Sequence, residues 1–138
     1  MTNKEVVLGF LKAADKNDET TVAKLFGKQH QFYSTMSPQP MNAEQHLGLL
    51  NTFNSGFSDS NHEVLDMIES GNKVILRGVW HGKHTGEFNS IPASGKQVHL
   101  SFIMIIEVEN GEMKNHWIEM DGMSFMMQIG AIPMPANA

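Results

Sequence analysis

The sequence contains no cysteine, and this absence excludes several kinds of site. A chain of 138 residues without cysteine has no disulfide framework, no thiolate nucleophile and no zinc site with cysteine ligands. Basic residues are also few: 10 lysines and arginines face 15 acidic residues, and the net charge is −5. Because phosphate binding needs clustered Lys and Arg, we expect no nucleic-acid partner.

Long apolar runs are missing as well. No segment approaches the roughly 18 apolar residues that a transmembrane helix needs, so we expect no membrane partner. The first residues carry Lys4, Glu5 and Lys12 and lack the apolar run and cleavage site of a signal peptide. The sequence therefore predicts a soluble, cytoplasmic protein, and its length fits one domain over residues 1–138.

Metal and nucleotide motifs are absent too. None of the seven histidines forms a His-x-x-x-His pair, and His81 and His84 are expected on opposite faces of a strand. The glycine motifs that hold phosphates or dinucleotides do not occur. We therefore expect no metal and no other cofactor.

The spacing of apolar residues changes along the chain. Apolar residues at helical spacing predict helices over 3–16, 19–26 and 43–57. Between the second and third of these we expect a loop with one short strand, "HQFYST". Alternation then predicts strands over 62–69, 73–88, 96–108 and 112–120, and a short closing helix that stops at Gly130. Helices followed by strands favour an α+β fold with an antiparallel sheet.

The strand "LSFIMII" (100–106) is apolar on both of its faces. In an antiparallel strand with one face exposed to water, apolar and polar residues alternate instead. One face can pack on the helices, and either a later segment of the chain or a second subunit covers the other. We favour a homodimer, with Ile103 and Ile105 facing the partner, because few residues remain to cover that face.

Asp121 is the leading candidate for acid/base chemistry. It follows an apolar strand and is surrounded in sequence by Trp117, Met120, Met123 and Phe125, which is a suitable setting for a general base. It can equally be the N-cap of the closing helix.

Two histidines can assist a carboxylate base. His84 and His116 are candidates to donate to a developing oxyanion, or to be ordinary hydrogen-bonded residues of the sheet. Strand alternation places His116 on the opposite face from Trp117 and Asp121, so His84 is preferred.

The chain has eleven methionines, seven of them from Met104 onward. Methionine fills irregular space, so this excess indicates either a loosely packed core or an adaptable pocket for a bulky, flat ligand. The residues that we expect to bind such a ligand are large and apolar: Trp80, Trp117, Phe102, Met104, Met123 and Phe53.

Two blocks of sequence resemble the SnoaL-like polyketide cyclase family, also called ester cyclases, of the nuclear-transport-factor-like superfamily. They are "RGVWHGKHTGEFNSIPASGK" and "GEMKNHWIEMDGMSFMMQIGAIP". The first is similar to the family's "G-T-H-T-G-E-F…G-I-P-P-T-G-K", and the second to its "G-K-I-x-E-H-W-x-x-x-D…Q-L-G". The chain departs from the family at "PASG" and at Gly122, where a larger residue is more common.

The resemblance implies a cone-shaped fold, in which a curved sheet wraps the N-terminal helices around a central apolar pocket. The glycine-rich stretch then lies where a long strand bends at the open end of the cone. Asp121 matches the family's acid/base aspartate, His84 matches the signature histidine, and His116 and Trp117 match the "H-W" pair.

The resemblance also implies a function. The hypothesis is a cofactor-free enzyme that uses acid/base catalysis for an intramolecular aldol cyclisation of a small apolar carbonyl compound. An isomerase or hydrolase with the same carboxylate, and a non-catalytic small-molecule binder, are the alternatives. A buried carboxylate favours the enzymes over the binder. An Asp–Arg–Asp site would depend on Arg77, the only arginine.

Overall fold

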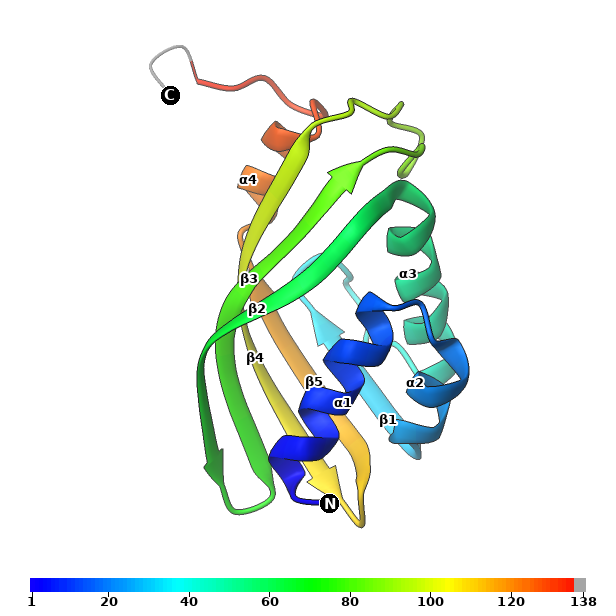
Figure 1. The fold of residues 1–138 in the computed structure, drawn as a ribbon, viewed down its shortest axis with the longest axis vertical. Helices are drawn as coiled ribbons and strands as arrows, with labels where there is room; N and C mark the ends of the chain where they lie inside the picture. Colours follow the sequence, from blue (N-terminus) through cyan, green and yellow to red (C-terminus); the bar gives the residue numbers. More distant parts are fainter. Residues whose placement is uncertain (136–138) are drawn as a thin grey trace.

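The computed structural model describes residues 1–135, which form four helices and a five-stranded sheet (Figure 1). The elements are α1 (Asn3–Asp15), α2 (Glu19–Leu25), β1 (Phe26–Ser34), α3 (Ala43–Gly56), β2 (Phe57–Ser70), β3 (Lys73–His84), β4 (Gln97–Glu109), β5 (Glu112–Met120) and α4 (Gly122–Gln128). The α+β prediction is confirmed. No helix within these residues is long and apolar enough to cross a membrane.

The sheet is mixed, with the strand order β1-β5-β4-β3-β2. Strands β2 to β5 pair with antiparallel neighbours, and β1 pairs with β5 in parallel. The predicted sheet was antiparallel throughout, and β1 was predicted to be shorter. Tight turns join β2 to β3 and β4 to β5, which makes those pairs antiparallel, whereas β1 and β5 are far apart in sequence and no hairpin links them.

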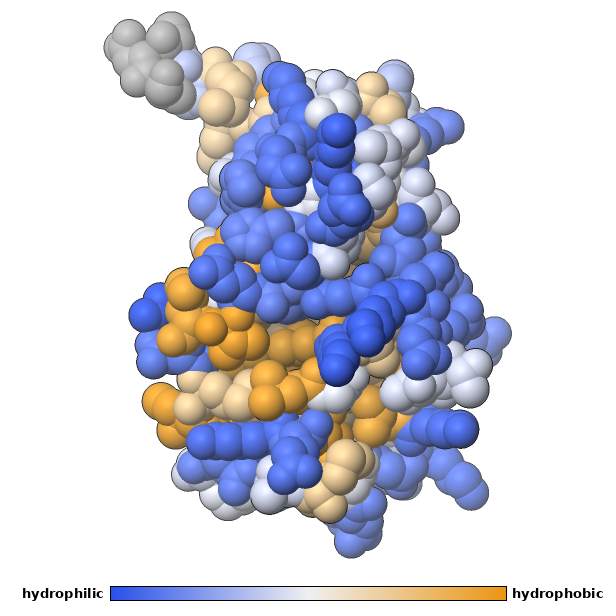
Figure 2. Space-filling model, in the orientation of Figure 1, coloured by the Kyte–Doolittle hydropathy of each residue, from blue (hydrophilic) through white to orange (hydrophobic). Residues whose placement is uncertain are grey.

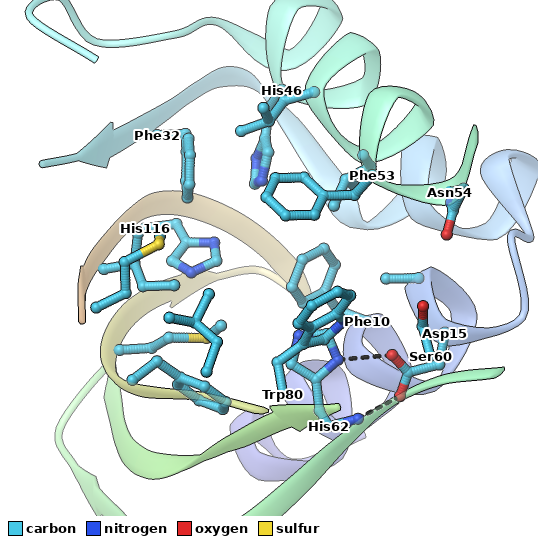
Figure 3. A pocket seen from close by; sticks show the side chains of 18 residues that line it. Phe10, Asp15, Phe32, His46, Phe53, Asn54, Ser60, His62, Trp80 and His116 are labelled. Carbon is cyan, nitrogen blue, oxygen red and sulfur yellow. Dashed lines mark hydrogen bonds and ion pairs between the residues drawn. The ribbon is translucent and has the colours of Figure 1, made fainter. Parts of the chain in front are cut away.

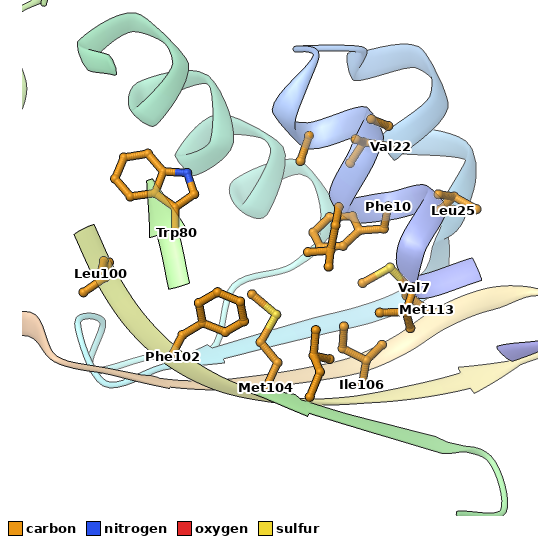
Figure 4. Close-up of a cluster of buried hydrophobic side chains, with 14 of the residues drawn as sticks. Val7, Phe10, Val22, Leu25, Trp80, Leu100, Phe102, Met104, Ile106 and Met113 are labelled. Atoms are coloured by element: carbon orange, nitrogen blue, oxygen red, sulfur yellow. The ribbon is translucent and has the colours of Figure 1, made fainter. Parts of the chain in front are cut away.

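The helices α1, α2 and α3 cover one face of the curved sheet (Figure 1). Alternate residues of β4 point toward them, so that Phe102, Met104 and Ile106 face Phe10 and Val7 of α1 in the core (Figure 4). The opposite parity of β4 points away from the helices. Ile103, on that outer face, leaves 53% of its surface exposed in the single chain.

Apolar side chains also reach the surface on β2. In the view of Figure 2 they gather near the middle of this strand, whose large exposed apolar residues are Leu65 and Ile68. Ile68 pairs with Ile75 of β3, and Ile75 pairs with Ile105 of β4. The outer face of the sheet therefore carries an apolar row across several strands.

The glycine-rich stretch brings the chain into two close contacts. A Cβ on Gly82 would lie 2.6 Å from the ring of Trp80, so the missing side chain lets the indole lie over the strand. A Cβ on Gly86 would lie 2.2 Å from the Ser55 carbonyl oxygen at the end of α3. The strand β3 ends at His84, before this second glycine, and not at 88 as predicted.

Candidate functional site

A cavity of about 100 Å³ lies between the helices α1 and α3 and the inner face of the sheet (Figure 3). Its walls are mainly aromatic and aliphatic. The lining residues are Phe10, Ala14, Asp15, Phe32, His46, Leu49, Leu50, Phe53, Asn54, Ser60, His62, Trp80, Leu100, Phe102, Met104, His116, Ile118 and Met120. A concave, largely apolar space with a few polar groups is the usual form of a small-molecule site.

The polar side chains gather at two sides of this cavity (Figure 3). Asp15, Asn54, Ser60 and His62 form one group, which we call the carboxylate end. The other group consists of His46 and His116, and we call it the histidine end.

At the carboxylate end, Asp15 holds the ring and the backbone of His62. The Oδ1 atom of Asp15 lies 2.7 Å from His62 Nδ1, and its Oδ2 accepts the backbone N–H of His62 at 2.9 Å. The carboxylate only accepts, so Nδ1 carries a proton and the other ring nitrogen, Nε2, is left to face the cavity. Within residues 1–135, His62 Nε2 has no hydrogen-bond partner.

Ser60 belongs to the same inner face of β2 as His62, two residues earlier. The register of β2 against β3 shifts between Ser58 and Asn61, and Asp59 has a positive φ of 53°. An irregularity of this kind re-aims neighbouring side chains. It brings the Ser60 hydroxyl to the cavity wall beside His62 (Figure 3).

At the histidine end, His46 belongs to a buried relay. His30 Nδ1 lies 3.1 Å from the Met113 carbonyl oxygen, and His30 Nε2 lies 2.9 Å from His46 Nδ1. Burial lowers the pKa of His30 and lowers the pKa of His46 well below its usual value, with nearby histidines adding repulsion at His46. Both rings are therefore neutral at neutral pH.

His116 completes the histidine end. It is fully buried, and neither ring nitrogen has a hydrogen-bond partner among the residues described. Burial lowers the pKa of His116 to about 3, and repulsion from His30 and His62 contributes. The ring is neutral and offers one N–H donor and one acceptor.

Five of the residues predicted from the sequence line this cavity. They are His116, Trp80, Phe102, Met104 and Phe53. The inner face of β5 carries His116, Ile118 and Met120. Strand alternation therefore separates His116 from Trp117 and Asp121 as predicted, and this cavity lies on the side of His116.

The other predicted residues lie elsewhere. Asp121 is exposed and caps α4, where its Oδ1 accepts the Ser124 N–H at 3.0 Å, and it borders a groove on the outer face. Trp117 stacks on Tyr33 on that outer face, and Met123 is 69% exposed. A catalytic role for Asp121 stays a prediction, and Asp121 does not line this cavity.

His84 is buried, yet it does not line the cavity. Its Nδ1 accepts the backbone N–H of Ser94 at 3.2 Å and lies 3.0 Å from the Ser94 hydroxyl. This contact holds the loop that follows β3. The structure therefore gives His84 a structural partner, and its predicted role as a donor to substrate has no support from this geometry.

Asp15, His46 and His62 were missed by the sequence analysis, although a signal exists. Asp15 continues the apolar positions Val7 and Leu11 of α1 at steps of four, and His46 precedes Leu50 on the apolar face of α3 in the same way. Asp15 and His46 are thus polar residues in the apolar stripe of a helix, and this pattern indicates that they face the interior. Within the chain as described, no three His, Asp or Glu side chains form a group able to hold a metal.

Comparison with known proteins agrees with this architecture. The family model of the SnoaL-like polyketide cyclases matches residues 4–129. None of the curated proteins gives a match. The chain belongs to the SnoaL-like polyketide cyclase family, since the match covers most of its length.

Solved structures with the same fold come from several bacteria. AclR of Streptomyces galilaeus, a candidate hydroxylase, is 20% identical and has a TM-score of 0.87 over 98% of this chain and 85% of its own. IdmH of Streptomyces antibioticus, a candidate polyketide cyclase, is 22% identical, with a TM-score of 0.83 over 94% of this chain and 99% of its own. TsrD of Streptomyces laurentii is 23% identical, with a TM-score of 0.79 over 94% and 95%. At these identities the likeness shows the fold.

Proposed function

We propose that this protein removes a proton from a carbon next to a carbonyl group in a small apolar ligand, with His62 as the general base. The observation that carries the proposal is the hydrogen-bonded pair of Asp15 and His62 in the wall of an otherwise apolar cavity. A carboxylate behind an imidazole fixes its orientation and stabilises the imidazolium that forms when Nε2 takes a proton. Asp15 is thus a positioning residue.

The enolate that forms needs a hydrogen-bond donor at its oxygen. The Ser60 hydroxyl is suited to this role because it lines the cavity on the same face of β2 as His62. The proton passes from carbon to His62 Nε2, and the electron pair of the broken C–H bond moves onto the oxygen.

Ring closure and isomerisation both start from this enolate. Membership of the SnoaL-like family supports closure, in which the enolate carbon attacks a second carbonyl of the same molecule. The first carbonyl then re-forms, and the alkoxide left at the second takes back the proton held on His62 Nε2. Holding both groups in one cavity supplies the proximity that this step requires. The cavity, of about 100 Å³, is smaller than the roughly 150 Å³ that encloses benzene, so the part of a ligand that it holds is at most about one six-membered ring.

The test is exchange of the α-protons of cyclohexanone in D₂O, followed by NMR. We expect the wild-type protein to accelerate exchange and His62→Gln to lower the accelerated rate by about 10²–10⁴, the usual share of a general base. Asp121→Asn is the matched control, because it alters an exposed helix cap outside the cavity, and we expect no loss of rate.

Two results would overturn this assignment. If His62→Gln exchanges at the wild-type rate, His62 is not the base. If Asp121→Asn lowers the rate as His62→Gln is expected to do, the aspartate predicted from the sequence is the base instead. A wild-type protein that binds cyclohexanone without any exchange indicates a binding protein.

A further inference from the structure

We propose that the histidine end of the cavity binds a hydroxyl group of the ligand, which donates to His46 Nε2. The inference deepens the proposed function, because it concerns the same cavity, and it names a ligand class: small phenols and enols. It is a statement about binding, so it can be tested without measuring turnover.

The hydrogen-bond relay determines which nitrogen of His46 meets the ligand. The Met113 carbonyl can only accept, so His30 Nδ1 carries the proton and His30 Nε2 has a free lone pair. His30 Nε2 can therefore only accept in its 2.9 Å hydrogen bond with His46 Nδ1, so His46 Nδ1 must carry the proton. In a neutral imidazole the second nitrogen then carries no hydrogen. His46 Nε2 can therefore only accept a hydrogen bond from a group in the cavity.

Aromatic contacts hold the two histidine rings of this end in place. His46 stacks on Phe32 with ring centroids 3.8 Å apart, and His116 meets Phe10 edge-on at 5.7 Å. The rings of His46 and His116 are 5.4 Å apart and inclined by 61°. At this separation the two rings pack against each other edge to face.

His116 lies beside this acceptor but does not contact the hydroxyl. Both of its ring nitrogens are buried without a partner in residues 1–135, and they expose almost no surface to the cavity. The hydroxyl of the ligand therefore meets one histidine nitrogen, the unprotonated Nε2 of His46.

A hydroxyl is the group that fits this acceptor. It donates one hydrogen bond and accepts others, whereas a carbonyl or an ether only accepts and would set its lone pairs against His46 Nε2. A carboxylate also only accepts and carries a charge as well, and no Lys or Arg of residues 1–135 lines the cavity to balance that charge. The aromatic walls favour a hydroxyl carried on a flat ring or a double bond.

Phenol, anisole and toluene form a matched set of probes. Phenol donates and accepts, anisole only accepts, and toluene does neither. By calorimetry we expect the wild-type protein to bind phenol about tenfold more tightly than either of the others. His46→Phe keeps the stacked ring and removes the acceptor, so its preference for phenol should disappear. In Leu8→Lys, which changes an exposed residue of α1 that does not line the cavity, the preference should remain.

A second measurement needs no variant. In the wild-type protein with ¹⁵N-labelled histidine, NMR should show His30 and His46 protonated at Nδ1, and phenol should shift the His46 Nε2 signal while toluene should not. Equal binding of the three probes means that only water occupies the histidine end, and the proposal is then wrong. A proton on His46 Nε2 also overturns it.

The outcomes separate this inference from the proposed function. A wild-type protein that prefers phenol but does not exchange α-protons supports the hydroxyl site and rejects His62 as a base. A wild-type protein that exchanges α-protons but shows no preference for phenol supports His62 as a base and rejects the hydroxyl site.

Discussion

Asp15 Oδ1 lies 2.7 Å from His62 Nδ1, although 47 positions separate the two residues in the sequence. The contact joins the last residue of α1 to the middle of β2, and Asp15 also accepts the backbone N–H of His62. The imidazole is therefore held at two points by one carboxylate. Because both partners line the cavity, this contact gives an apolar space a defined basic nitrogen.

We expect Asp15 and His62 to act as one unit. Asp15→Asn should slow the exchange of cyclohexanone α-protons by about 10–10², because an amide holds the ring less firmly and carries no charge to balance the imidazolium. His62→Gln should cost more. The double variant should be no slower than His62→Gln alone, since effects of residues that act together are not additive.

The measurement is a double-mutant cycle on the exchange rate. Binding of cyclohexanone, followed by calorimetry, should change little in Asp15→Asn. Additive losses in the double variant would show that Asp15 acts independently of His62.

Stability should fall as the pH is lowered from about 6.5 toward 3, because His116 is protonated more readily in the unfolded chain. Burial lowers the pKa of His116 from 6.5 to about 3 in the folded protein, so between these values the unfolded state binds the additional proton. The contribution of neutral His116 is complete above pH 6.5 and is lost progressively below it. Each pKa unit corresponds to about 1.4 kcal/mol.

His116→Gln isolates this contribution, because the amide does not titrate in that range. The free energy of unfolding in urea should fall less steeply with decreasing pH for this variant than for the wild type. Parallel curves for the two proteins would show that His116 keeps an ordinary pKa in the folded state.

The helices and strands were predictable because each carries its own local pattern. The apolar spacing of α1 and the alternation of β4 depend only on nearby residues, and both agree with the structure to within a few positions. The parallel pairing of β1 with β5 was not predictable in this way, since no turn in the sequence encodes it.

The site was harder to predict because it forms from distant residues. Strand alternation placed His116 on the opposite face from Trp117 and Asp121, as the structure shows. The alternation alone does not determine which face of the strand packs against the helices. A carboxylate among apolar residues drew attention to Asp121, which caps α4 at the surface. Asp15 was overlooked because its partner, His62, is not its neighbour in sequence.

Gly86→Ala should destabilise the protein by about 1–3 kcal/mol, the usual cost of overpacking. The added Cβ would lie 2.2 Å from the Ser55 carbonyl oxygen, which is backbone and cannot move freely. Gly9→Ala is the control: it lies within α1 with no atom within 4 Å of the new Cβ, and should stabilise by about 0.5–1 kcal/mol. Thermal unfolding compares the two, and an unchanged Tm for Gly86→Ala would contradict the close approach.

The outer face of the sheet supports the expectation of a homodimer. An apolar row crosses the five strands through paired positions: Ile68, Ile75, Ile105, Trp117 and Tyr33. Ile103 lies beside this row and is 53% exposed in the single chain. Contiguous apolar surface of this kind is typical of protein interfaces.

We expect light scattering at micromolar concentration to give twice the chain mass of 15.4 kDa for the wild type. Ile103→Lys should give a monomer or an insoluble protein, because an unpaired charge is costly inside an apolar interface. Leu8→Lys is the control, since Leu8 is similarly exposed, at 46%, but lies on α1 and away from the outer face of the sheet. It should remain a dimer. A wild-type protein that runs as a monomer would show that the apolar row is not a subunit interface, and the lysine at position 103 would then leave the mass unchanged.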